Sequence, residues 1–277
     1  MPPSHLTLGY AQCVSTPAQS GPRVIAVANQ KGGVGKTTSV VNLSASIALM
    51  DKRVLVVDLD PQGNASTGLG IEIRGLSTSV YDVLLHEIPM EDVVQACAVK
   101  VLFVVPANLD LAGAEIELVP TMGRETRLRK TLERVAADYD YVFIDCPPSL
   151  GLLTVNALTA AGEVLVPVQC EYYALEGLAQ LLRNIELVNK NLNPTLQVST
   201  ILCQMYDGRT KLSADVVREL RQHFGDKVLQ TVIPRTVKIA ESPSHGTPVV
   251  VLEPTGPGAQ AYRAAAQEVV NGRSEKR

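Results

Sequence analysis

A glycine-rich segment with two lysines constrains this chain more than any other feature. It consists of Lys31, Gly32, Gly33, Val34, Gly35, Lys36, Thr37 and Thr38. In such a loop the glycines let backbone N–H groups converge on phosphate oxygens, the final lysine brings a mobile positive charge, and the threonine after it offers a hydroxyl to Mg²⁺. An apolar run at 23–28 predicts a strand before the loop, and the pattern at 38–50 predicts a helix after it. Strand, loop and helix in this order predict a phosphate-binding loop.

A dinucleotide-binding loop is the nearest alternative for this segment. That loop requires a third glycine where this chain has Thr38, and it has no use for Lys36 and Thr37. The first lysine, Lys31, is an addition that the general motif does not need. It points to a nucleotide switch whose site is completed only when two copies meet.

Length and composition are compatible with a single large α/β domain. The chain has 277 residues, 46% of them apolar, a net charge of −3 and a pI near 5.9. An acidic balance excludes a protein that coats nucleic acid with its whole surface, so any DNA contact must come from a local basic patch. Five cysteines without a CxxC pair, no secretory signal and no apolar run of about twenty residues predict a soluble, cytoplasmic protein with reduced thiols.

Apolar runs alternate with helical patterns along residues 23–277, which we expect to form one domain after a flexible N-terminal arm at 1–22. Further strands are predicted at 54–57, 101–105, 141–144, 164–168, 198–202 and 228–233. Further helices are predicted at 78–86, 124–138, 151–161, 174–191, 211–224 and 258–271. The strands are apolar throughout, as strands buried on both faces should be. The predicted fold is therefore α/β: a doubly wound, mostly parallel sheet with helices on both faces.

Carboxylates follow two of the predicted strands, at the sheet edge where ligands bind in such folds. Asp58 and Asp60 end the strand at 54–57 and share a face, and Asp145 ends the strand at 141–144. Asp145 is placed to hold Mg²⁺ through water. Asp60 is a site candidate with a turn or cap as its alternative, whereas Asp58 is equally compatible with a site and with structural hydrogen bonding.

As a set, these motifs closely resemble the ParA/Soj family of chromosome-partitioning ATPases, P-loop enzymes of the ParA/MinD superfamily. The resemblance rests on the two-lysine loop (a deviant Walker A motif), Asp58-Leu-Asp60-Pro-Gln-Gly-Asn64, Asp145-Cys-Pro-Pro-Ser149, Ile233-Pro-Arg235 and Glu241-Ser-Pro-Ser-His245-Gly246. It covers nearly everything from Arg23 to the last helix. The loop alone is shared with MinD and the nitrogenase iron protein.

The resemblance implies an ATPase that dimerises with ATP and Mg²⁺. Lys31 would reach the phosphates of the partner's ATP, Lys36 and Thr37 would keep the general roles of the loop, and Asp60 would orient or deprotonate the attacking water. Asp145 would lie in the outer shell of Mg²⁺, next to Thr37 and Asp60. The adenine would be framed by Pro234 and Arg235, with Met205 a weaker candidate.

The resemblance also implies binding to nonspecific double-stranded DNA and stimulation by a ParB-like partner, hence a nucleoid-associated protein. Residues 209–238 carry seven basic and three acidic side chains, and Arg209 and Lys238 stand at positions that help to form a DNA surface in similar proteins. A solvated helix face is the alternative for this stretch, and also for the basic helix at 124–134.

Three rival functions share the loop. A MinD-like membrane switch ends in an amphipathic helix, whereas 271–277 has no apolar face. A nitrogenase-like reductase needs two cluster cysteines per subunit, and Cys146 has no counterpart after Leu109, so we expect Cys146 to be a buried, inert thiol. A metabolic kinase or ligase stays open, and phosphate transfer to a small substrate would reveal it.

Overall fold

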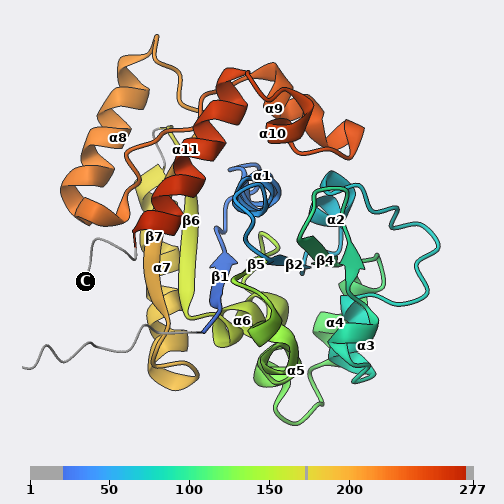
Figure 1. Ribbon diagram of the computed structural model, residues 1–277. Helices are drawn as coiled ribbons and strands as arrows, with labels where there is room; N and C mark the ends of the chain where they lie inside the picture. The colour runs from blue at the N-terminus through green and yellow to red at the C-terminus, as the bar shows by residue number, and fades with distance from the viewer. Residues whose placement is uncertain (1–20, 172–173, 273–277) are drawn as a thin grey trace, which may run out of the picture.

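The computed structural model describes residues 21–171 and 174–272, so the predicted arm lies, apart from its last two residues, outside the described part. A seven-stranded sheet runs through the middle in the order β3-β4-β2-β5-β1-β6-β7 (Figure 1). Its strands are β1 (Arg23–Val27), β2 (Val54–Asp58), β3 (Gln95–Ala96), β4 (Leu102–Val105), β5 (Tyr141–Asp145), β6 (Glu163–Gln169) and β7 (Gln197–Gln204). All neighbours are parallel except β3 with β4, which confirms the predicted mostly parallel, doubly wound sheet.

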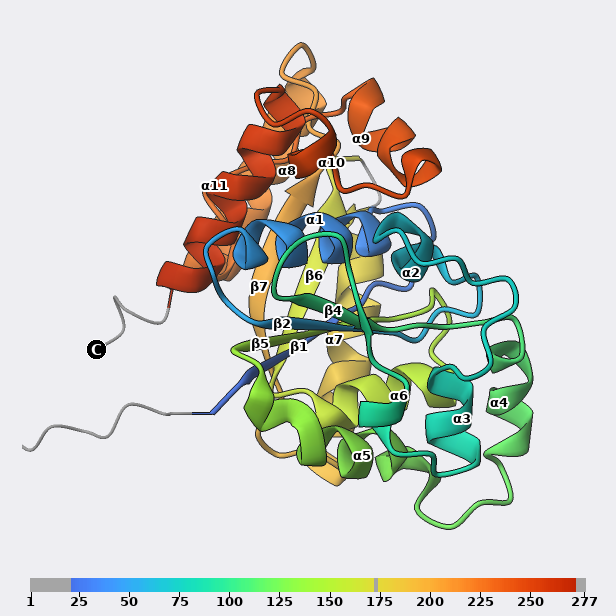
Figure 2. The ribbon, with the colours of Figure 1, turned by 45° about the vertical axis from the view of Figure 1, so that its right-hand side comes forward.

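Helices cover both faces of the sheet (Figure 2). On one side lie α1 (Lys36–Ala48), α2 (Asn64–Gly68), α9 (Val237–Glu241), α10 (Val249–Leu252) and α11 (Pro257–Asn271). On the other lie α3 (Val80–Leu85), α4 (Leu111–Glu117), α5 (Arg127–Val135), α6 (Leu152–Ala160) and α7 (Ala174–Asn191). The remaining α-helix, α8 (Lys211–Phe224), follows the edge strand β7, and short 3-10 turns occupy 90–92, 124–126, 136–138, 225–227 and 242–245.

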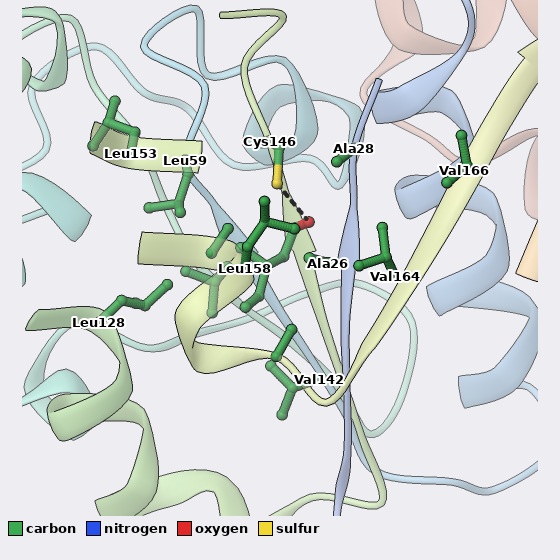
Figure 3. Close-up of a cluster of buried hydrophobic side chains, with 14 of the residues drawn as sticks. Ala26, Ala28, Leu59, Leu128, Val142, Cys146, Leu153, Leu158, Val164 and Val166 are labelled. Carbon is green, nitrogen blue, oxygen red and sulfur yellow. Dashed lines mark hydrogen bonds between the residues drawn. The ribbon is translucent and has the colours of Figure 1, made fainter. Parts of the chain in front are cut away.

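Alternate residues of each central strand enter two separate apolar cores. In β5, Val142 and Ile144 face the core beneath α5 and α6, whereas Phe143 faces the core beneath α1 and α11. Figure 3 shows the first of these cores, with Leu128 of α5 and Leu158 of α6 beside the strands. Burial on both faces requires the continuous apolar runs seen in the sequence, and it fixes the strand ends that carry the polar side chains.

The strand predicted at 228–233 is wrong. This segment forms no continuous ladder with β7: isolated bridges join Val228 to Ile201 and Pro234 to Tyr206. Two backbone N–H groups, those of Leu229 and Ile233, donate to the Ile201 and Cys203 carbonyls of β7 at 3.0 and 2.8 Å. Between those bridges the backbone N–H groups of Gln230 and Thr231 donate to the Glu268 carboxylate of α11, at 2.7 and 2.8 Å. In the middle of the segment, a side chain thus replaces the ladder hydrogen bonds that a continuous strand would need.

The sequence analysis did not predict β3, nor the helices α2, α4, α9 and α10. The two-residue strand β3 pairs antiparallel with β4 and is too short to produce an apolar pattern. Helix α4 is apolar on more than one side, so its sequence lacks the contrast between faces that marks an amphipathic helix. Within 21–171 and 174–272, no helix is both long and apolar enough to span a bilayer.

Candidate nucleotide site

The phosphate-loop candidate joins β1 to α1 at the carboxyl edge of the sheet. Gly33 and Gly35 adopt φ of 74° and 89°, a left-handed conformation that favours glycine. A Cβ on Gly35 would also lie 3.3 Å from the Gln204 side chain. At the front of the loop, the Lys31 N–H donates to the Asn29 side chain at 3.0 Å, and that side chain donates to the Pro167 carbonyl at 2.7 Å. The loop is therefore anchored on both sides and leaves the N-terminus of α1 directed at the site.

The second lysine of the loop, Lys36, is the first residue of α1 and is only 7% exposed. Burial lowers its pKa, while the nearby carboxylate of Asp145 acts in the opposite direction. Its Nζ lies 3.5 Å from the Lys31 carbonyl, which is a weak hydrogen bond for a charged group. A buried ammonium with so little compensation is well placed to pair with an anionic ligand.

The acid at the end of β2, Asp58, is engaged in structural hydrogen bonds. Its carboxylate accepts from the Asp60 N–H at 3.1 Å, the Ser66 N–H at 2.8 Å and the Ser66 hydroxyl at 2.7 Å. Burial raises the pKa of Asp58 to about 6, and these hydrogen bonds oppose the shift. The sequence was compatible with either a site role or structural hydrogen bonding for Asp58. The contacts favour structural hydrogen bonding, since they connect the loop after β2 to the start of α2.

Asp145 differs from Asp58 in its hydrogen bonds, although the two residues pair in register on adjacent strands. Its carboxylate is fully buried, and neither oxygen makes a hydrogen bond that meets normal geometry with the described residues. Burial and then the negative charge of Asp58 raise its pKa well above the usual range, while Thr37 and Lys36 lie close enough to oppose the rise. A buried carboxylate that lacks partners costs free energy unless a cation completes its surroundings.

This arrangement fits Mg²⁺ held together with nucleotide phosphates. Thr37, Asp60 and Asp145 lie around the Lys36 end of the loop, and the Asp60 carboxylate accepts the Gln62 N–H at 3.0 Å. Among the described residues, no cluster of three metal-binding side chains exists that could hold a metal alone. Mg²⁺ commonly keeps several waters and uses few protein ligands beside phosphate, so this donor set suits it.

The additional lysine, Lys31, extends from the loop to the end of β6 within the same chain. Its Nζ lies 3.1 Å from Glu171 Oε2 and 3.3 Å from Gln169 Oε1. Both members of the ion pair are about half exposed, with side-chain exposures of 45% and 48%. Sequence reasoning missed these two partners, although their position directly after a buried strand, at the ligand edge, was a usable signal.

The residues predicted to frame the base lie together at the end of β7. Tyr206, next to Met205, donates its N–H to the Ile233 carbonyl at 2.9 Å, and the Arg235 N–H donates to the Tyr206 carbonyl at 3.1 Å. Met205 itself has φ of 55°, which turns the chain sharply after the strand. Met205, Pro234 and Arg235 therefore form one bridged corner next to Gln204, which contacts Gly35.

A buried hydrogen-bond chain connects this corner to the phosphate loop. The Tyr262 hydroxyl donates to Gln204 Oε1 at 3.3 Å, Gln204 Nε2 donates to the Ser39 hydroxyl at 2.7 Å, and Ser39 donates to the Gly35 carbonyl at 2.6 Å. Three elements far apart in the sequence, α11, β7 and α1, thus fix the loop. None of these side chains was singled out from the sequence.

Comparison with known proteins places this site in a family. A family model described as an AAA domain matches residues 22–198. The sporulation initiation inhibitor protein Soj of Bacillus subtilis is 55% identical over 247 residues, which are 89% of this chain and 98% of Soj. The chromosome partitioning protein ParA of Caulobacter vibrioides is 52% identical over 90% of this chain and 94% of that protein. This chain belongs to the ParA/Soj family of chromosome-partitioning ATPases.

Solved structures with the same fold include proteins other than ParA and Soj. A cobyrinic acid a,c-diamide synthase from Mycobacterium smegmatis, with bound ADP and magnesium, is 41% identical with a TM-score of 0.81. The two structures match over 92% of this chain and 97% of that one. The septum site-determining protein MinD of Pyrococcus horikoshii, complexed with Mg-ADP, is 25% identical with a TM-score of 0.72, over 92% and 99% of the two chains.

The cations predicted to contact DNA in this ParA/Soj-family chain are both engaged locally. Arg209, with its side chain 89% exposed, forms two hydrogen bonds to Asp207, at 2.9 and 2.7 Å, and this pairing lowers the pKa of Asp207 to about 2. Lys238 lies 3.1 Å from Glu241. In the other basic stretch, Arg127 pairs with Glu87 at 2.6 Å. Exposed pairs of this kind are weak, so they leave the cations available to a stronger anion.

The ParA/Soj-family chain also has a counterpart to one cluster cysteine of the nitrogenase-like rival. Cys146 is fully buried, its thiol is 3.8 Å from the Ile144 carbonyl (Figure 3), and burial raises its pKa. A protonated, enclosed thiol is a poor cluster ligand. This environment agrees with the expected inert thiol.

Proposed function

We propose that this ATPase is a DNA-partitioning switch with ATP and Mg²⁺ as its cofactors. In the ATP state two copies join about the nucleotide and bind nonspecific double-stranded DNA, and hydrolysis stimulated by a ParB-like partner releases them. The observation that carries this proposal is the buried Asp145 carboxylate beside Lys36 and Thr37, which accepts no hydrogen bond of normal geometry from the described residues, in a chain 55% identical to Soj. Repeated cycles would position a bound DNA complex along the nucleoid.

In the proposed mechanism, the loop N–H groups and Lys36 bind the phosphates, and Thr37 and Asp145 orient the metal site. Bound Mg²⁺ would neutralise charge on the phosphates during transfer. Asp60 holds or deprotonates the attacking water, since its carboxylate lies beside this group and has free acceptor capacity. Corner residues Met205, Pro234 and Arg235 would then frame the adenine.

Dimerisation would require Lys31 to leave Glu171 and Gln169 and reach the phosphates of the partner's ATP. The ion pair that it leaves is about half exposed, so breaking it costs about 1 kcal/mol or less. A charge-assisted contact to phosphate is stronger, roughly 1.5–3 kcal/mol. The exchange is therefore favourable once a second nucleotide-loaded copy is present.

DNA binding would follow from the same step, because a dimer combines two weak basic surfaces. Arg209 and Lys238 would exchange their local carboxylates for DNA phosphates, and contacts of this kind do not depend on base sequence. Two linked patches bind much more tightly than one. Loss of the terminal phosphate would separate the copies and hence the patches.

Size-exclusion chromatography of an Asp60→Ala variant tests this proposal. With ATP and Mg²⁺ we expect a stable dimer that co-elutes with nonspecific duplex DNA, and with ADP a monomer that does not. Wild-type protein is the control, because it should return to monomer as ATP is consumed. A variant that stays monomeric with ATP would refute the switch.

One structural neighbour supports a second candidate, since a protein 41% identical to this chain is described as a cobyrinic acid a,c-diamide synthase. Such an enzyme would couple ATP cleavage to amide formation on a carboxylate. The higher identity to Soj favours partitioning. ATP consumption that depends on cobyrinic acid and an ammonia source, and not on DNA or partner, would reverse that preference.

A further inference from the structure

The hydrogen-bond chain of Tyr262, Gln204 and Ser39 is closed to water. All three residues are at most 2% exposed, although each side chain ends in a polar group. Helix α11, which carries Tyr262, packs against α1 on the same face of the sheet (Figure 2). In such a setting of low dielectric constant, a hydrogen bond is electrostatically stronger than it is in water. The chain can therefore influence the group at which it ends.

The hydrogen bonds of this chain can run in only one direction. The chain ends at the Gly35 carbonyl, which has no hydrogen to give, so the Ser39 hydroxyl 2.6 Å away is the donor. Ser39 has then used its one hydrogen and accepts from Gln204, whose amide nitrogen lies 2.7 Å away. The amide oxygen of Gln204 accepts from Tyr262, because burial raises the pKa of this phenol and keeps its hydroxyl protonated. Every hydrogen in the chain points toward Gly35.

The group at the end of the chain is the peptide group that joins Gly35 to Lys36. Its carbonyl also accepts the Ser39 N–H at 2.9 Å, so two donors fix its direction. Its other end is the Lys36 N–H, in the first turn of α1, where N–H groups have no carbonyl of the helix to bind. Hydrogen bonds in a row polarise one another, so donors on the carbonyl make the N–H of the same peptide group a stronger donor. The chain thus acts on an N–H group that the loop offers to a phosphate.

Gln204 also connects the loop to the corner proposed for the base. Its side chain lies 3.3 Å from the position of a Cβ on Gly35, directly under the loop. Its backbone carbonyl accepts the Cys170 N–H at 3.1 Å. It is the last residue of β7 and precedes Met205, where the backbone turns with φ of 55°. The sheet therefore holds the backbone of Gln204, and its amide group has little freedom beneath the loop.

We propose that Tyr262, Gln204 and Ser39 are positioning residues for nucleotide binding. They fix the carbonyl of Gly35 and strengthen the N–H of Lys36 as a donor to phosphate. Because a trans peptide group points its C=O and N–H in opposite directions, holding the carbonyl also aims the N–H. This inference rests on the proposed function only in taking the loop as the phosphate site, and no part of it depends on DNA, on dimerisation or on a partner protein.

Calorimetry of the full-length protein with ADP and Mg²⁺ tests this inference without interference from hydrolysis. Ser39→Ala removes the hydroxyl that contacts the Gly35 carbonyl, and we expect it to raise the Kd about three- to tenfold, the effect of one hydrogen bond. Tyr262→Phe removes only the most distant donor and should raise the Kd about two- to threefold.

Ser46→Ala is the matched control for Ser39→Ala. The Ser46 hydroxyl also donates to the carbonyl four residues earlier, that of Asn42, at 2.6 Å, and Ser46 is 1% exposed in the same helix. Its hydrogen bond does not lead to the loop. Ser46→Ala should therefore lower Tm about as much as Ser39→Ala and still bind ADP with the Kd of wild type.

Amide NMR separates polarisation from a general loss of packing. In the ADP complex of ¹⁵N-labelled protein, the Lys36 amide proton should resonate at higher field in Tyr262→Phe than in wild type, because its hydrogen bond to phosphate is weaker. Ser46→Ala should leave this resonance in place. If Ser39→Ala does not fold, Tyr262→Phe decides the question through its Kd and its Lys36 resonance.

Wild-type affinity in both Ser39→Ala and Tyr262→Phe would overturn the inference. An equal loss of affinity in Ser46→Ala would overturn it as well, because the effect would then be one of helix stability. Lys36→Ala tells the two proposals apart. If Lys36→Ala binds ADP as wild type does, the loop is not the phosphate site and both proposals fall. If only Lys36→Ala loses affinity, the proposed site stands and the positioning role falls.

Discussion

Two neighbouring buried acids should respond in opposite ways to the same substitution. Asp58 and Asp145 are register neighbours on β2 and β5, and burial raises the pKa of both. Asp58 accepts three hydrogen bonds, whereas neither oxygen of Asp145 makes one of normal geometry with the described residues. We therefore expect Asp58→Asn to destabilise the nucleotide-free protein and Asp145→Asn to stabilise it.

The magnitudes follow from the contacts. An amide at position 58 cannot accept from all three donors, and a buried donor left unsatisfied costs about 1–3 kcal/mol. At position 145 the substitution removes a buried charge and no normal hydrogen bond, so we expect a gain of about 1–2 kcal/mol at pH 8. For a domain of this size, each 1 kcal/mol shifts Tm by roughly 2–4 °C.

The dependence on pH has a definite sign. Because the folded-state pKa of Asp58 is about 6 and its ordinary value is 3.8, the folded protein retains a proton that the unfolded chain loses in this interval. Stability of the nucleotide-free protein should therefore fall as the pH rises from about 4 through 6, and the raised pKa of Asp145 extends the fall. Asp145→Asn should flatten this dependence.

Thermal unfolding at pH 5 and pH 8, without nucleotide and with ATP and Mg²⁺, provides the assay. Ligand at 100 times its Kd stabilises a protein by about 2.7 kcal/mol, and Asp145→Asn should lose part of this gain. The reasoning is refuted if Asp145→Asn is less stable than wild type at pH 8 without nucleotide. A shift of both variants in the same direction would refute it as well.

Three further predictions concern the loop and the basic surface. Lys36→Ala should weaken ATP binding about 10- to 100-fold, the loss of one charge-assisted contact, and calorimetry that finds unchanged affinity would remove Lys36 from the site. Gly35→Ala should lower Tm by several degrees and reduce ATP binding, because residue 35 has φ of 89° and an added Cβ would lie 3.3 Å from the Gln204 side chain. Gly32→Ala is the control and should preserve the fold, because an added Cβ there would have no neighbouring atom within 4 Å. Arg209→Glu should weaken DNA association and reduce its salt dependence without changing basal hydrolysis. If the variant is retained on DNA as well as wild type, Arg209 does not contact DNA.

The sheet was predictable because its strands are buried on both faces. Continuous apolar runs located β1, β2 and β4 to β7, and the loop motif located the ligand edge. The segment at 228–233 has the same composition as a strand, but Glu268, almost forty residues later, takes its central hydrogen bonds. Only the tertiary structure contains that information.

The sequence indicated which residues would lie together at this edge of the sheet, but not which hydrogen bonds and ion pairs each of them would make. Two acids at strand ends look alike in a sequence, yet Ser66 satisfies Asp58 and Asp145 lacks comparable partners. Likewise, the sequence drew attention to Lys31 but could not reveal that its ammonium pairs with Glu171 of the same chain. Such differences depend on which side chain fills the neighbouring space.

Because α11 is translated last, its hydrogen bonds to the nucleotide site are missing while the chain is still being made. Tyr262 and Glu268 belong to a helix translated after every other part of the nucleotide site, and they brace β7 and the segment before Pro234. A nascent chain that still lacks 257–271 has its glycine loop but not the bracing of that loop. We therefore expect ATP to bind more weakly to ribosome-bound or C-terminally clipped intermediates than to the finished chain.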